Sequence, residues 1–321
     1  MSNHKLKPFL QNLLPKICKS IIAELQNEEE IDLEALFAYA ESLCDILYSS
    51  YEYRQKDGQR LITLTASESK EIVHGIIIVI ESGLKRRSGH FQKINNDLSV
   101  LTPDERYEID QELEEEQNLL TQLVDSIGYV LKSLEIAFVD TFDSFVAPFF
   151  QPLLTAKGTN DIRARLAAVC LFDDFVEHCG RAGAAKHAPA LLQGVLDGLD
   201  DNKNQKDKEL KQASIYGIAQ IARYAPASTL AEVVIPLSQV LQKVIIEDDD
   251  PNILENAVSA IASMVLFVDS HFVDLPGIDR VTITRLFMKA LPLEQDYDEA
   301  KVRTFFSFIC FFLLKVICWF V

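Results

Sequence analysis

Three residues near the middle of the chain have the types that a charge-relay system uses. Asp174 and His178 are four positions apart, so on a helix they lie one turn from each other, with Asp173 beside them. Such a system also needs a serine or cysteine nucleophile within hydrogen-bond reach of the histidine. No nucleophile motif supplies one, so we interpret the three residues as an exposed helix face that ends in a histidine.

Metal and phosphate chemistry have no stronger candidates. His178 and Cys179 form an isolated pair, His74 lies among apolar residues as a packed or edge histidine, and the other histidines are scattered singly. A zinc site needs three or four converging ligands. The chain has neither a Gly-rich phosphate loop nor a Walker lysine. We therefore predict a protein that is not an enzyme and that has no catalytic, cofactor-binding or metal site.

Carboxylates are the most prominent charged feature. Eight of them lie within 13 residues at the start of a predicted helix: Asp104, Glu105, Glu108, Asp110, Glu112, Glu114, Glu115 and Glu116. Carboxylates favour the positive end of a helix dipole, but eight exceed what that end requires. We predict that this acidic run contacts a Lys- and Arg-rich protein partner, together with a second cluster at a turn between helices, Glu247, Asp248, Asp249 and Asp250. The alternative is an acidic surface without a ligand.

The overall composition agrees with a basic protein partner. The formal net charge is −17, which attracts basic proteins and disfavours nucleic acid, whose phosphates are bound by lysine and arginine. Six widely spaced cysteines without a Cys-x-x-Cys pair are typical of reduced thiols in a cytosolic or nuclear protein. We expect no secretory signal at the N-terminus. We interpret Lys85-Arg86-Arg87 as the basic end of a helix rather than as a localisation signal.

One helical pattern occurs three times in the second half of the chain. The three stretches begin at residues 164, 210 and 253, which are 46 and 43 positions apart, and their apolar residues coincide: Phe172, Ile218 and Ile261, then Phe175, Ile221 and Met264. A second apolar stripe follows each stretch, over 191–199, 230–244 and 286–291. A period of about 40–47 residues with two helices is the signature of HEAT or armadillo repeats. Such a pair buries its apolar face only by stacking on its neighbours, so the sequence predicts an all-α fold, an α-solenoid of HEAT-like helical hairpins.

Helical periodicity also covers the first half. Apolar stripes occupy 10–25, 33–47 and 120–134, and a partner helix is expected from about 141 to 154. Thr65 and Glu68 form a capping box that opens a helix as far as residue 84. The dense β-branched residues at 76–80 leave a buried strand as an alternative there. Gly158 is expected to end one repeat, and Thr159 with Asn160 to cap the next.

These patterns divide the chain into three parts. HEAT-like repeats that include the acidic run occupy 1–158, three clear HEAT repeats occupy 159–303, and an apolar tail occupies 304–321. The tail approaches the ~20 residues that cross a bilayer, but Lys315 lies well inside it. We interpret the tail as a truncated repeat or an artefact of the gene model, with a membrane anchor as the alternative.

Several segments resemble the C-terminal half of the importin-β (karyopherin-β) family, and its importin beta three branch in particular. The segments are 172–179 (FDDFVEHC), 213–224 (ASIYGIAQIARY), 255–261 (ENAVSAI) and 291–300 (LPLEQDYDEA). Together with the acidic run, they follow the order and the spacing of the family from about residue 105 to residue 310. Family members are much longer, and nothing in this chain resembles their N-terminal repeats.

The resemblance implies a nuclear import receptor. It would wrap basic cargo, such as ribosomal proteins or histones, on an acidic concave face lined by the second helix of each pair. The resemblance also implies Phe-Gly nucleoporins as partners, and residence in the cytoplasm, the nucleus and the nuclear pore. In the family Ran-GTP contacts the N-terminal repeats, so we do not expect Ran binding by this chain alone, nor nucleic-acid or membrane binding. The alternatives are a HEAT-repeat scaffold of another complex and a tail-anchored membrane adaptor.

Overall fold

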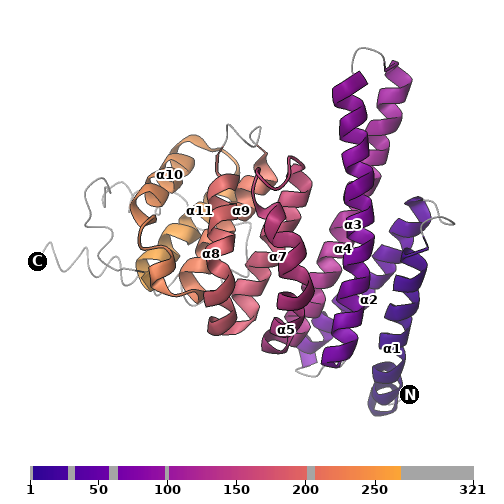
Figure 1. Ribbon diagram of the computed structural model, residues 1–321. Coiled ribbons are helices and arrows are strands. Elements are labelled where there is room, and N and C mark those ends of the chain that lie inside the picture. The colour runs from indigo at the N-terminus through magenta and orange to yellow at the C-terminus, as the bar shows by residue number, and fades with distance from the viewer. Residues whose placement is uncertain (1–2, 28–32, 58–63, 98–100, 201–206, 269–321) are drawn as a thin grey trace, which may run out of the picture. The chain divides into compact units, whose positions relative to one another are not determined.

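The computed structural model describes residues 3–27, 33–57, 64–97, 101–200 and 207–268 (Figure 1). Within these ranges every regular element is a helix and no strand occurs, which confirms the all-α prediction. The strand alternative at 76–80 is wrong, because these residues lie inside α3 (Ala66–Asp97). The stripe at 286–291, the segment 291–300 and the apolar tail 304–321 lie outside the described residues.

The chain forms two compact units, whose boundary falls inside α7 (Ile162–His178). The first unit contains Met1–Leu153 and Lys157–Asp174, and the second contains Leu154–Ala156 and the chain from Phe175 onward. Each unit buries its own apolar side chains.

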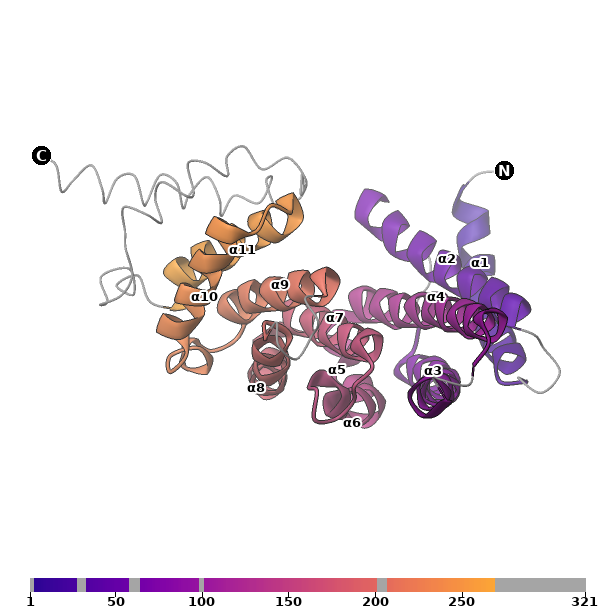
Figure 2. The same cartoon turned by 90° about the horizontal axis from the view of Figure 1, so that it is seen from above.

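Four long helices open the first unit. They are α1 (Asn3–Leu25), α2 (Leu33–Asp57), α3 and α4 (Pro103–Leu134). Helix α2 packs along α4, α1 packs against α3, and α3 lies beside α4 (Figure 2). Their shared core includes the fully buried side chains of Leu43, Ile76 and Ile127. The α3–α4 hairpin is longer than its neighbours and reaches beyond the ends of α1 and α2 (Figure 1).

The partner helix expected at 141–154 is irregular. After α4 the chain passes through η1 (Glu135–Phe138), α5 (Val139–Thr141), the π-turn η2 (Phe142–Val146), α6 (Ala147–Phe150) and η3 (Gln151–Leu154). Glu135 has a φ of 53°, which ends α4 and prevents a continuous helix into the segment that follows. Pro148 and Pro152 each remove a backbone donor farther on. The segment nevertheless buries Phe138, Phe142 and Phe150 completely, so packing holds it together where regular hydrogen bonding does not.

The three similar helices of the sequence are α7, α9 (Lys208–Tyr224) and α11 (Pro251–Ser263). All six matching apolar side chains are at most 1% exposed, which confirms the predicted repeat register. In the second unit α9 packs against α8 (Gly180–Gly198) and α11, and α11 packs against α10 (Val234–Glu247). Two short helical elements also belong to this unit, η4 (Ala227–Thr229) before α10 and η5 (Met264–Val268) after α11. These helices therefore stack on their neighbours in sequence.

Helix starts follow local capping chemistry. The predicted capping box is present before α3: Thr65 N–H donates to Glu68 Oε2 at 2.9 Å, and Glu68 N–H donates to Thr65 Oγ1 at 3.2 Å. The predicted cap of α7 was placed too early, because Asp161, rather than Thr159 or Asn160, accepts the N–H of Arg163 at 3.0 Å. Gly158 does stand at the turn, where an added Cβ would lie 1.6 Å from the Pro152 carbonyl oxygen.

Candidate protein-binding surface

Helix α4 presents the acidic run and begins with a complete capping box. Thr102 N–H donates to Glu105 Oε2 at 2.8 Å, and Glu105 N–H donates to Thr102 Oγ1 at 3.3 Å. The N–H and the hydroxyl of Thr102 lower the pKa of Glu105, which stays charged. Pro103 occupies the first helical position, where its missing backbone N–H costs nothing because that N–H would have no acceptor in the helix. The carboxylates that follow are thus carried by a well-started helix.

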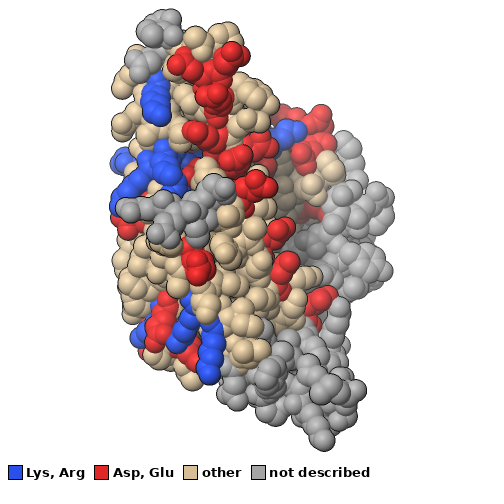
Figure 3. All heavy atoms as spheres, turned by 90° about the vertical axis from the view of Figure 1, so that its right-hand side faces the viewer, with Lys and Arg blue, Asp and Glu red and all other residues tan. Residues whose placement is uncertain are grey.

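Seven of the eight predicted carboxylates are exposed to solvent: Asp104, Glu105, Glu108, Asp110, Glu112, Glu114 and Glu115. Ile109 is the buried residue among them and packs this part of α4 onto the unit. In Figure 3 acidic side chains form a column that descends from the top, where the α3–α4 hairpin ends, with basic side chains beside it. We call these seven residues the α4 acidic surface.

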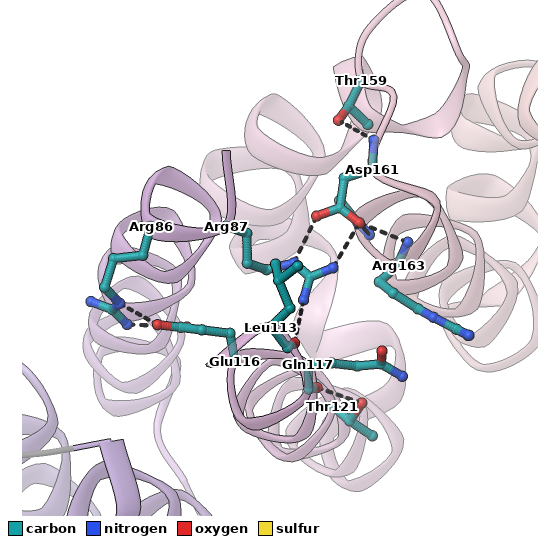
Figure 4. A network of polar contacts seen from close by, with 10 residues as sticks. Arg86, Arg87, Leu113, Glu116, Gln117, Thr121, Thr159, Asp161 and Arg163 are labelled. Atoms are coloured by element: carbon teal, nitrogen blue, oxygen red, sulfur yellow. Dashed lines mark hydrogen bonds and ion pairs between the residues drawn. The ribbon is translucent and has the colours of Figure 1, made fainter. Parts of the chain in front are cut away.

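Glu116 differs from the other seven, because it is only 1% exposed. Its carboxylate accepts an ion-paired hydrogen bond from Arg86 Nε, and Arg86 Nη2 lies 3.3 Å from Oε2 (Figure 4). A buried carboxylate that is held by arginine within the fold is not offered to a partner. Glu116 is therefore a structural residue here, and it does not belong to the α4 acidic surface.

Arg87, in the basic run Lys85-Arg86-Arg87 of α3, links three elements of the first unit. Its guanidinium holds Asp161 through two hydrogen bonds of 2.7 and 3.0 Å, and it donates to the Leu113 carbonyl oxygen at 2.8 Å (Figure 4). The same guanidinium lies 5.5 Å from the Phe91 ring centroid. Because Asp161 also caps α7, this single side chain ties α3, α4 and the start of α7 together.

The predicted role of Lys85-Arg86-Arg87 as a helix end is wrong, because α3 continues to Asp97. Arg86 and Arg87 are occupied by internal carboxylates, and Lys85 forms an exposed pair with Glu81 at 3.0 Å. One turn farther along α3, His90 Nδ1 lies 3.3 Å from Glu112 Oε2. Arg86 and Arg87, but not Lys85, therefore link α3 to its neighbouring elements.

The second acidic cluster, in the other unit, lies at the turn between α10 and α11. Asp250 accepts the N–H of Asn252 at 3.1 Å as the cap of α11, and Asp248 pairs with Lys211 at 2.8 Å. Partial burial opposes the charge of Asp248, but Lys211 and the Asp250 N–H outweigh it and lower its pKa. Glu247 lies 3.7 Å from Lys243, and Asp249 is exposed. Two of these four carboxylates, Asp248 and Asp250, thus serve the turn itself.

The three residues considered for a charge relay are buried or lie beside charged side chains of the fold. Asp173 is 3% exposed, which differs from the predicted exposed face. Asp174 pairs with Lys132 at 3.0 Å, and His178 Nε2 lies 3.9 Å from Glu177 Oε2. His74 is an edge histidine, and its ring centroid lies 4.9 Å from that of Phe145 with the two rings tilted by 38°. Among the described residues, no group of three or more His, Cys, Asp or Glu side chains could hold a metal ion. In the same part of the chain, no helix is long and apolar enough to span a bilayer.

Solved structures identify the architecture. No protein-family model matches the chain. The chain is similar to Kap121p bound to Nup53p and to Kap121p bound to Ste12p, each with 20% identity and a TM-score of 0.67 over 96% of this chain. It is also similar to the karyopherin Kap121p bound to the SUMO protease Ulp1p, with 20% identity and a TM-score of 0.60 over 91%. The chain has the karyopherin fold.

This similarity confirms the predicted solenoid and supports the predicted resemblance at the level of the fold. The chain spans about a quarter of the length of these karyopherin chains, since the matches cover 25–26% of them.

Proposed function

We propose that this chain is a segment of an importin-β-type nuclear transport receptor and that the α4 acidic surface binds Lys- and Arg-rich cargo. The observation that carries the proposal is an exposed row of seven carboxylates on a karyopherin fold. Each exposed ion pair contributes about 0–1 kcal/mol, so such a surface binds through many weak contacts rather than through one deep pocket. Lys- and Arg-rich segments, such as those of ribosomal proteins and histones, match this chemistry.

The acidic run lies on α4, which follows α3 in the α3–α4 hairpin. The turn between α10 and α11 remains a second proposed contact, through its two exposed carboxylates Glu247 and Asp249. Cytoplasmic and nuclear residence and Phe-Gly nucleoporin binding belong to the same proposal. Nup53p, Ulp1p and Ste12p are partners of Kap121p.

A charge-neutral variant tests the surface. We expect Glu108→Gln, Asp110→Asn and Glu115→Gln, combined in one chain, to weaken binding of a Lys- and Arg-rich peptide by at least about threefold, because three exposed pairs are lost. The measurement is the Kd by fluorescence anisotropy with a labelled peptide.

The matched control removes the same number of charges elsewhere, from three exposed side chains: Glu24→Gln, Asp140→Asn and Glu232→Gln. It should bind nearly as the unmodified chain does. Equal weakening in both triple variants would show that net charge alone attracts the peptide. Absence of binding to basic peptides and to Phe-Gly repeats by the unmodified chain would favour a scaffold of another kind.

A further inference from the structure

Three tyrosines gather on the surface of the first unit, away from the α4 acidic surface. The ring of Tyr129 on α4 lies 5.3 Å from the ring of Tyr48 and 6.0 Å from the ring of Tyr51, both on α2 (centroid distances). The rings are tilted by 57° and 36°, so they form an angled wall rather than a flat stack. Tyr48 is 43% exposed, while Tyr51 and Tyr129 are half-buried. The exposed ring of Tyr48 can therefore offer a π face to a ligand.

Carboxylates from three helices surround the tyrosines. Glu41 and Asp45 precede Tyr48 by about two turns and one turn on α2 and are exposed. Asp125 precedes Tyr129 by one turn on α4, and Asp174 reaches in from α7. Burial raises the pKa of the Cys44 thiol to about 11, and Asp125, Asp45 and Glu41 add to this rise. Carboxylates of α2 and α4 therefore lie close to Cys44, one turn before Tyr48 on α2.

The acids also act on one another and on the tyrosines. Burial raises the pKa of Asp125, Asp174 adds to the rise, and Lys132 opposes it. Burial and then Asp125 raise the pKa of the Tyr129 hydroxyl. Asp174 approaches α4 closely because residue 128 is glycine, where an added Cβ would lie 3.0 Å from Asp174 Oδ2.

An internal cation already uses this combination of groups. Lys132 Nζ lies 3.0 Å from Asp174 Oδ2 and 5.9 Å from the Tyr129 ring centroid. The lysine thus combines an ion pair with a cation–π contact on the Tyr129 side of the cluster. Tyr48 has the exposed ring and the exposed carboxylate of Asp45 about one turn before it on α2, while Asp125 acts on the neighbouring Tyr129.

We propose that Tyr48, Tyr129, Asp45 and Asp125 form a subsite for an arginine side chain of a partner protein. A guanidinium is planar and weakly hydrated, so it stacks on a tyrosine while its N–H groups reach a carboxylate, which a compact, strongly hydrated ammonium does less well. This inference rests on the proposed function for the kind of partner, but its residues lie outside the α4 acidic surface.

The test compares two peptides on the full 321-residue chain. One short peptide carries arginines spaced by glycine and serine, and the other carries lysines at the same positions. We expect the arginine peptide to bind at least about threefold more tightly. Tyr48→Ala should remove this preference, whereas Tyr48→Phe, which keeps the ring, should retain it. Tyr107→Ala is the matched control, since Tyr107 is also an exposed tyrosine (64%) but lies among the acids of α4.

The outcomes separate this inference from the proposed function. Loss of the arginine preference in Tyr48→Ala, with normal thermal unfolding and an unaffected Tyr107→Ala, supports the subsite. An unchanged preference in Tyr48→Ala, or an equal loss in Tyr107→Ala, overturns it. If the triple variant of the α4 acidic surface binds normally while Tyr48→Ala loses the preference, the subsite stands and the proposed role of α4 fails. The reverse pattern leaves the α4 proposal standing and refutes the subsite.

Discussion

Arg87 shows how one side chain organises the region that carries the candidate surface. It is 3% exposed and contacts a carboxylate that caps a third helix, a carbonyl of α4 and an aromatic ring of its own helix. A planar guanidinium can satisfy all of these at once, and a lysine cannot. The sequence offered only a basic tripeptide, and the identity of its partner depended on which chain segment lies beside it.

Replacing Arg87 should therefore be costly. We expect Arg87→Ala to lower the free energy of unfolding by about 3 kcal/mol, because it leaves Asp161 buried without its charge partner. Urea denaturation followed by circular dichroism measures the change. Lys85→Ala is the control, since that side chain is 72% exposed and should change stability little. Equal stability of the two variants would contradict the structural role given to Arg87.

Helices were predictable where local signals are strong. The apolar period fixed the register of α7, α9 and α11, and Thr65 with Glu68 marked the start of α3. Thr102 and Glu105 have the same Thr-x-x-Glu pattern, so the start of α4 could also be predicted from the sequence. The length of α3 was underestimated, because its last three turns are polar and gain support from pairing with α4 rather than from an apolar stripe.

The capping box of α4 gives a prediction for the candidate surface itself. Thr102→Ala should lower the free energy of unfolding by about 1 kcal/mol and let the first turn of α4 fray. Hydrogen exchange measured by mass spectrometry should then speed up in the segment that begins at Pro103. Thr121→Ala is the control, because the hydroxyl of Thr121 bonds only the Gln117 carbonyl within the helix. Unchanged exchange at the start of α4 in Thr102→Ala would contradict this account of the helix start.

The two parts of the candidate site differ in how far the sequence could predict them. Clustered carboxylates in one helix are visible as a run, so seven exposed members could be named in advance. The burial of Glu116 could not, because it depends on Arg86 of the neighbouring helix. The tyrosine cluster also joins residues about 80 positions apart, which single-sequence periodicity does not bring together.

The chain as a whole has more acids than its own cations can pair. Asp and Glu number 48 against 31 Lys and Arg, and several of those cations, such as Arg86, Arg87 and Lys211, are already held by internal carboxylates. The excess negative charge is therefore left on surfaces such as that of α4. On a karyopherin fold, that excess is the property that would attract basic proteins over distance.

Salt dependence of binding tests this claim most directly. The measurement is the Kd of the chain for a Lys- and Arg-rich peptide across about 50 to 200 mM salt, within which exposed charges become increasingly screened. We predict that affinity falls steeply over this range, and that the fall is shallower in the triple variant of the α4 acidic surface. An affinity that stays flat across the range, or a slope that the triple variant does not change, would contradict an electrostatic role for this surface.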